Sequence, residues 1–175
     1  MKGNYSIITS IVLFFIFSLT QNALGVGGGS KGAIYAIESN GDMLYYKFDG
    51  LKDGTKKWSV TGKKIGNGWR FKNVFAGDNG SIYAIESNGD MLYYKFDGLK
   101  DGTKKWSVTG KKIGNGWRFK NVFAGDNGSI YAIESNGDML YYKFDGLKDG
   151  TKKWSVTGKK IGNGWRFKNV FAGYK

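Results

Sequence analysis

The chain contains no cysteine, no histidine and no proline among its 175 residues. The absence of cysteine excludes disulfides and thiol nucleophiles, and the absence of histidine further excludes Cys/His zinc sites and Ser-His-Asp triads. Glycine, in contrast, accounts for 29 residues, and aromatic residues make up 17% of the chain. This combination predicts many short strands joined by tight turns, because the aromatic side chains supply enough apolar surface for a core.

The first 25 residues have the pattern of a secretory signal peptide. Lys2 provides the positive start, Ile7 to Leu19 form an apolar run, and Ala23-Leu24-Gly25 provide a small-x-small cleavage pattern. The apolar run is shorter than the roughly 20 residues that span a bilayer, which argues against a transmembrane anchor. We therefore expect residues 1–25 to be removed, residues 26–32 to form a glycine-rich lead-in, and the mature protein to be secreted and extracellular without a membrane span.

Three near-identical units make up the rest of the chain. Residues 81–124 recur without change at 129–172, and residues 33–76 differ from them only at Ala33, where the other units have serine. The period of 48 residues lies in the range of β-propeller blades. The period divides residues 33–175 into repeats at 33–80, 81–128 and 129–175.

Each unit is predicted to contain four strands. In the middle unit these are Ile82–Ile85, Met91–Phe96, Trp106 to about Ile113, and Phe119–Ala124, separated by turns rich in Gly, Asn and Asp. The first two strands are apolar at consecutive positions, so both faces of the sheet need cover, which stacked propeller blades provide. The predicted fold class is all-β: a propeller of four-stranded antiparallel blades, with three repeats in a ring that is incomplete or closed by oligomerisation.

The ends of the repeat region indicate how such a ring could close. The region opens on a strand of the first type, Ile34–Ile37, and finishes on one of the fourth type, Phe167–Ala172. Elsewhere the turn Asp126-Asn127-Gly128 joins these two types, so the last strand of one copy has a natural partner in the first strand of another. We expect a homo-oligomer, with a head-to-tail dimer of about six blades as one form, and frayed end blades as the alternative.

One block of residues resembles a known family. Lys111-Lys112-Ile113-Gly114-Asn115-Gly116-Trp117 is followed by Phe119-Lys120-Asn121-Val122-Phe123, and then by Gly128-Ser129-Ile130-Tyr131-Ala132-Ile133. With Trp106 upstream, this block resembles the blade signature of the tachylectin family. Members are β-propeller lectins with about five blades and one site per blade for N-acetylated amino sugars. The resemblance implies a multivalent lectin that binds glycans of the GlcNAc or GalNAc type. The chain departs from the family in its three units and in Lys47-Phe48-Asp49-Gly50, where many relatives have Arg-His before the Asp-Gly.

The candidate sugar site combines an aromatic platform with fixed polar groups on loops, because a sugar ring presents an apolar C–H face and a rim of hydroxyls. One Trp would stack on the sugar, while Asn and Asp would hold hydroxyls or the acetamido group. Glycines beside the asparagine would let a ligand approach the backbone. The predicted carbohydrate-binding residues are Asp53, Trp58, Asn67, Trp69, Asp101, Trp106, Asn115, Trp117, Asp149, Trp154, Asn163 and Trp165.

Each of these residue types also has a structural interpretation. A tryptophan that occurs once per blade can be a core or inter-blade packing residue. Asn115 can adopt a left-handed turn conformation, and Asp101 can be a turn residue before Gly102. Tyr93 and Tyr94 lie in mid-strand and are predicted to be core residues.

Catalysis does not follow from this repeat. Glycoside hydrolysis needs two carboxylates in different environments, whereas identical units repeat identical environments. We therefore predict no enzymatic activity, no catalytic residue, no cofactor and no metal site. Two sequons, at Asn79 and Asn127, could carry glycans or could serve only as turns.

Two other functions remain open. Removal of residues 1–25 leaves a net charge of +12, and Lys104-Lys105, Lys111-Lys112, Arg118 and Lys120 recur in every unit. A positive ring of this kind could bind polyanions such as lipopolysaccharide or sulfated glycans, although the same charges could simply keep the protein soluble; specific nucleic-acid binding is not expected. The third possibility is a structural, protein-interaction propeller.

Overall fold

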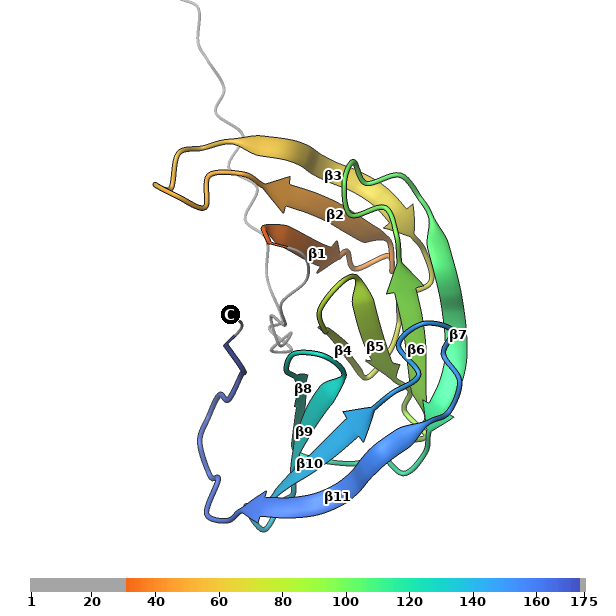
Figure 1. Cartoon of the computed structure of the whole chain (residues 1–175), viewed down its shortest axis with the longest axis vertical. Coiled ribbons are helices and arrows are strands. Elements are labelled where there is room, and N and C mark those ends of the chain that lie inside the picture. The colour runs from red at the N-terminus through yellow and green to blue at the C-terminus, as the bar shows by residue number, and fades with distance from the viewer. Residues whose placement is uncertain (1–30, 174–175) are drawn as a thin grey trace, which may run out of the picture.

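The computed structural model describes residues 31–173, and the predicted signal peptide lies outside this range. Eleven strands form three antiparallel sheets, shown in Figure 1, and no helix able to span a membrane occurs among these residues. The strands are β1 (Ala33–Ile37), β2 (Met43–Phe48) and β3 (Trp58–Gly66) in the first sheet; β4 (Asn73–Ala76), β5 (Ser81–Ile85), β6 (Met91–Phe96) and β7 (Trp106–Gly114) in the second; and β8 (Asn121–Ala124), β9 (Ser129–Ile133), β10 (Met139–Phe144) and β11 (Trp154–Gly162) in the third.

These strands confirm the predicted all-β class and the four strands expected in the middle unit. The prediction Met91–Phe96 coincides with β6, and the other strands agree within about two residues at each end, which is the usual uncertainty of a strand boundary. The fourth strand is the least accurate, because β8 begins at Asn121 instead of Phe119.

Each complete sheet combines strands from two sequence units. β4 belongs to the first unit but pairs with β5 of the second, with Phe75 opposite Tyr83. β8 pairs with β9 in the same way. The connecting turns place Asn79 at φ 49° and Asn127 at φ 52°, a left-handed conformation that asparagine tolerates better than most residues. The structural blade is therefore offset from the sequence unit by one strand, and the hairpin between units lies inside a sheet.

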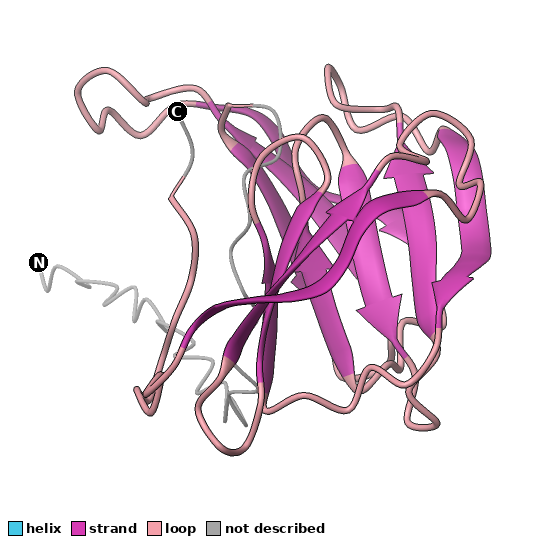
Figure 2. Cartoon of the chain, turned by 60° about the horizontal axis from the view of Figure 1, so that its bottom comes forward, coloured by secondary structure: helices cyan, strands magenta, loops and turns pink. Residues whose placement is uncertain are grey.

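Both faces of the middle sheet are covered, as the consecutive apolar residues predict. All five residues of β5 are buried. Ile82 and Ala84 pack in the cluster that contains Met43 of the first sheet, whereas Tyr83 packs in the cluster that contains Phe144 of the third. Alternate residues of one strand thus face opposite neighbours, and the three sheets stack as blades along the arc seen in Figures 1 and 2.

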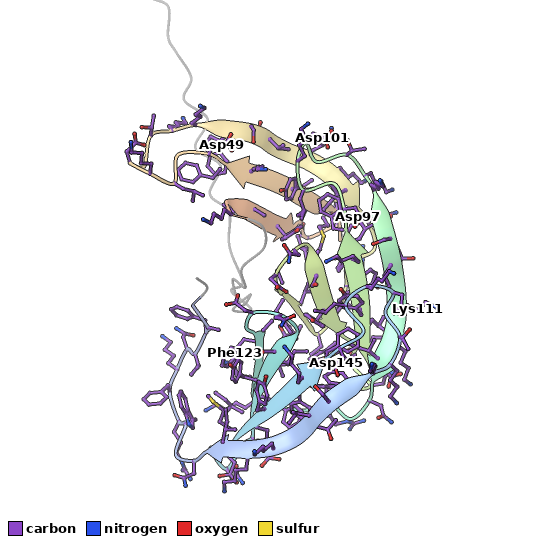
Figure 3. All side chains as sticks on the ribbon, in the orientation of Figure 1. Asp49, Asp97, Asp101, Lys111, Phe123 and Asp145 are labelled. Carbon is purple, nitrogen blue, oxygen red and sulfur yellow. The ribbon has the colours of Figure 1, made fainter. Side chains whose placement is uncertain are left out.

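In the second and third blades, one loop is hydrogen-bonded to the preceding blade. We call residues 97–105, between β6 and β7, the strap loop; Asp101 is labelled on it beside β3 in Figure 3. The Tyr45 hydroxyl donates a hydrogen bond of 2.8 Å to the carbonyl oxygen of Leu99, and the Lys63 ammonium donates one of 3.2 Å to that of Asp101. The next blade repeats the first contact, since the hydroxyl of Tyr93 donates to the carbonyl oxygen of Leu147 at 2.8 Å. Hydrogen bonds of this kind fix how one sheet sits on the next.

The two end blades differ from the middle one. The sheet of β1, β2 and β3 has no fourth strand within the described residues. The prediction of a fourth-type strand at Phe167–Ala172 is wrong for the single chain, because these residues form no strand. A strand is held by hydrogen bonds to a neighbouring strand, and no strand of residues 31–173 lies in that position. Figure 1 shows this segment running along the third sheet, on the open side of the arc.

Substitution at Gly102 tests the packing of the strap loop. Gly102 has φ +69°, and a Cβ there would lie 3.0 Å from Val60 Cγ1 and 3.1 Å from Tyr45 Cδ1. Gly116 has a similar φ of +74° but open space around its Cβ position. We expect both Gly→Ala variants to incur the left-handed backbone cost, and Gly102→Ala to lower the free energy of unfolding by about 1–3 kcal/mol more than Gly116→Ala. Urea denaturation measures the difference, and equal effects would contradict the packing of this loop.

Candidate functional site

An aromatic group joins the first and second sheets. Trp69 follows β3, Tyr94 lies on β6 and Trp106 begins β7. The ring centroids of Trp69 and Tyr94 are 4.6 Å apart, and those of Trp69 and Trp106 are 5.8 Å apart. The indole N–H of Trp106 donates a 3.0 Å hydrogen bond to the carbonyl oxygen of Ile65. These contacts form what we call a seam, the line along which a blade packs on the blade before it.

The second seam repeats this geometry. Trp117 lies 4.6 Å from Tyr142 and 5.8 Å from Trp154, measured between ring centroids. The indole N–H of Trp154 donates to the carbonyl oxygen of Ile113 at 2.9 Å. Two equivalent aromatic groups are therefore complete within the described chain.

The two tryptophans in each group have different surroundings. Trp69 and Trp117 are buried in the core clusters, whereas Trp106 and Trp154 are half-buried. A Cβ on Gly114 would lie 2.4 Å from Trp117 Nε1, so this glycine makes room for the indole of its own unit. The sequence interpretation assigned that space to a ligand. The packing interpretation thus describes Trp69 and Trp117, whereas Trp106 and Trp154 keep part of their surface exposed.

The predicted asparagines are exposed in the loops that follow β3 and β7. In the sequence, Asn67 stands between Ile65 and Trp69, both of which contact Trp106. Asn115 has the same place in the second seam. Neither asparagine adopts the left-handed conformation that the structural interpretation allowed; among the described residues that conformation belongs, apart from glycines, to Asn79 and Asn127. The side chains of Asn67 and Asn115 are exposed, two residues before the buried indoles of Trp69 and Trp117.

The predicted aspartates lie in the loops that precede β3, β7 and β11. Asp101 is exposed in the strap loop, where its carboxylate accepts a 2.9 Å hydrogen bond from the backbone N–H of Thr103. Asp53 and Asp149 make the same bond to Thr55 and Thr151. Hydrogen bonds from these threonines lower the pKa of all three carboxyl groups. Each aspartate closes a turn, as the structural interpretation proposed for Asp101.

The structure regroups the residues that one sequence unit lists together. Trp106 faces the preceding blade, whereas Trp117 of the same unit faces the following blade. The contacts instead bring Trp69 to Trp106, and Trp117 to Trp154. Sequence reasoning placed Tyr94 in the core; the structure places it half-buried against Trp69. Burial raises the pKa of Tyr94 and of Tyr142, so both hydroxyl groups keep their protons at neutral pH.

The remaining predicted residues form half-groups at the two ends of the described chain. Trp58 contacts Tyr46 at 6.2 Å between ring centroids but no tryptophan, and Trp58 is 39% exposed. Trp165 contacts Phe167 at 5.7 Å, and Asn163 beside it is exposed. Each half-group has the residues of one side of a seam.

Comparison with known proteins gives a family. The model of the Tachylectin family matches residues 25–173. The chain belongs to the tachylectin family. Membership indicates a lectin role, the binding of carbohydrate. A search of curated proteins returned no match.

Among solved structures, this tachylectin-family chain is similar to a chain of the structure titled "Crystal structure of Kap60 bound to yeast RCC1 (Prp20)". The TM-score is 0.36 and the identity 16%, over 76% of this chain and 36% of that one. The chain thus spans 36% of the length of that solved chain. A likeness of this size is no evidence of a shared partner.

Substitution of neighbouring residues separates the core side of the seam from its surface. Trp117→Ala removes a buried indole between two sheets, and we expect it to lower the free energy of unfolding by about 3–5 kcal/mol. Asn115→Ala changes an exposed side chain two residues away and should stay within about 0.5 kcal/mol of the parent. Urea denaturation followed by circular dichroism measures both, and a Trp117→Ala variant as stable as the parent would contradict the packing described.

Proposed function

We propose that the protein is a multivalent lectin that recognises N-acetylated amino sugars of the GlcNAc or GalNAc type on cell-surface glycans. The observation that carries this proposal is the repetition of one aromatic group at two seams with the same ring distances of 4.6 and 5.8 Å, each with an exposed asparagine two residues before its buried tryptophan. The tachylectin family supports a carbohydrate ligand.

The proposed site in each seam has an aromatic floor and a polar edge. The half-buried rings of Trp106 and Trp154 would stack on the apolar face of the sugar, because a sugar C–H face packs well on an indole. The side chains of Asn67 and Asn115 would bind hydroxyls or the acetamido group. Trp69 and Trp117 would hold the accessible ring in place from below. Asp101 in the strap loop, and Asp149 in the equivalent loop of the next blade, would contact only a longer glycan that extends along the seam.

The carboxylates favour binding over catalysis. A glycosidase uses one carboxyl group with a raised pKa as its acid and a second, ionised one. Asp101 and Asp149 instead share a lowered pKa with the same cause, hydrogen bonds from the threonine two residues on. Repeated equivalent sites suit a lectin, because tethering several weak sites raises apparent affinity by about 10²–10⁴-fold.

We further propose that the protein is secreted after removal of residues 1–25 and acts as a homo-oligomer, with a head-to-tail dimer as its form. The first sheet, which has three strands, and the unpaired segment after β11 support the head-to-tail arrangement. Extracellular glycans are the ligands that a secreted lectin would meet.

The basic surface supports a second candidate, binding to polyanions. Lys104, Lys105, Lys111 and Lys120 are all exposed, and Lys111 lies on β7. Lys112 is partly neutralised by Asp90 at 2.6 Å. Affinity for a polyanion falls steeply with salt, whereas sugar binding through stacking and hydrogen bonds does not.

A double substitution tests the proposed lectin site. Asn67→Ala with Asn115→Ala removes the polar edge at both complete seams, and each lost contact is worth about 1–3 kcal/mol, so affinity for N-acetylglucosamine at these two sites should fall about 5- to 150-fold. Isothermal titration calorimetry at low and high salt measures this affinity. The parent should bind equally at both salt concentrations.

The control is Thr109→Ala, an exposed position on β7 in mid-strand. This variant should bind like the parent. Unchanged affinity in the double variant would exclude the seam as the sugar site, and binding that disappears at high salt would favour the polyanion function instead.

A further inference from the structure

The large hydrophobic residues exposed in residues 31–173 gather at the two ends of the arc. Ile34 is 43% exposed while its equivalent Ile82 is 1% exposed, and Phe171 is 72% exposed while Phe75 is 2% exposed. All members of this set have equivalents in the middle unit that are buried or half-buried. The set comprises Ile34, Leu51 and Trp58 on what we call the first face, and Ile161, Phe167 and Phe171 on the second face.

Each face has the residues that supply one side of a seam. The second face corresponds to the side of a blade that receives the next blade, since Ile161 is equivalent to Ile65 and Ile113, whose carbonyl oxygens accept the indole N–H of Trp106 and Trp154. The first face corresponds to the side that packs on a preceding blade. Trp58, which is 39% exposed, is there.

We propose that the second face of one copy joins the first face of a second copy in a complete seam, and that this junction builds a further sugar site from Asn163 and Trp165 of one copy with Tyr46 and Trp58 of the other. The sugar part of this proposal rests on the lectin function proposed above. Residues 169–172 become the missing fourth strand of the sheet of β1, β2 and β3, in the place that β4 and β8 have in the other two sheets.

The C-terminal segment already packs on the third sheet. The Asn121 side-chain amide donates a 3.2 Å hydrogen bond to the carbonyl oxygen of Val170. Val170 and Ala172 also pack on the cluster of Phe123, Ile133 and Met139, and Phe123 is labelled in Figure 3 on the side of β8 that faces this segment. One side of the segment is therefore docked, and only its strand partner is lacking.

The register of this new pairing follows from β4 and β8, the equivalent strands of the two four-stranded sheets. Phe75 lies opposite Tyr83 in the register of β4 with β5, and Phe123 lies opposite Tyr131 in that of β8 with β9. Both pairs of rings stack at 5.3 Å. By the same register, Phe171 lies opposite Tyr35 of the second copy.

The polar contacts of a seam are also available at the junction. Trp58 of the second copy would donate its indole N–H to the carbonyl oxygen of Ile161, as Trp106 does to Ile65. The hydroxyl of Tyr141 would donate to the carbonyl oxygen of Leu51 of the second copy, as Tyr45 does to Leu99. The junction thus requires no contact that the chain does not already make twice.

Two copies are the number that closes a ring. The two faces of one chain lie apart across the open side of the arc in Figures 1 and 2. Two copies of the three blades described here make six, and propellers have about four to eight. Two seams inside each chain and one at each junction give three sites per chain.

Light scattering combined with calorimetric titration by N-acetylglucosamine tests this proposal on the mature protein. The parent should be a dimer with three sites per chain. Phe171→Lys places a charge on the second face at an exposed side chain, so this variant should keep its circular dichroism spectrum and become a monomer with two sites per chain. The matched control is Thr157→Lys, which adds the same charge at an exposed position of β11 and should remain a dimer.

A complementation experiment covers the case in which Phe171→Lys alone misfolds. Ile34→Lys blocks the first face, so it should also give a monomer, while each variant keeps the face that the other has lost. A mixture of the two should associate as a pair through one intact junction. Failure of two folded variants to associate would overturn the head-to-tail contact.

The outcomes separate this inference from the lectin function. A folded parent that is monomeric overturns the junction, and a dimer with two sites per chain overturns the third site. A dimer that Phe171→Lys dissociates but that binds no sugar supports the junction and contradicts the proposed lectin function instead.

Discussion

The contact between neighbouring sheets is the constraint on which the structure depends. β5 has apolar residues at the four positions from Ile82 to Ile85 and buries all five of its residues, so it is stable only between two other sheets. Ile82 and Tyr83 point to opposite neighbours, and the strap loop adds hydrogen bonds from Tyr45 and Lys63. A single blade of this sequence would expose one apolar face or both. The repeat folds because each copy covers the next.

The proposed function uses the same contact. The half-buried indole of Trp106 is held by the carbonyl oxygen of Ile65 and by the ring of Trp69, both from the preceding blade. A ligand that stacks on this ring meets a surface fixed by packing, so little side-chain freedom is lost on binding. Every new seam therefore adds a potential site, which couples the number of blades to the number of ligands bound.

Much of the fold could be predicted from the sequence, because local patterns carry it. The turn residues set the strands, and the consecutive apolar residues of β5 and β6 indicated stacked sheets. The offset between blade and sequence unit was harder to predict, since it depends on whether β4 pairs with a strand of its own unit or with β5 of the next one. The strand expected at the C-terminal end failed for a related reason: the pattern of Phe167–Ala172 is correct, but a strand also needs a neighbour.

The candidate site could be predicted only in part. Residue type and exposure pointed correctly to Asn115 as a polar group on a loop. The partners could not be read from the sequence, because Trp69 meets Trp106 of the next unit and a perfect repeat hides which copy supplies each side. The sequence interpretation also gave the space at Gly114 to a ligand, whereas Trp117 of the same unit fills it.

A crystal structure of the mature protein with N-acetylglucosamine tests the central claim most directly, that the seams between blades are both the structural contact and the binding site. The account predicts sugar on the exposed faces of Trp106 and Trp154, beside Asn67 and Asn115, at every seam. Sugar bound within one sheet, or on a surface away from these tryptophans, would contradict it.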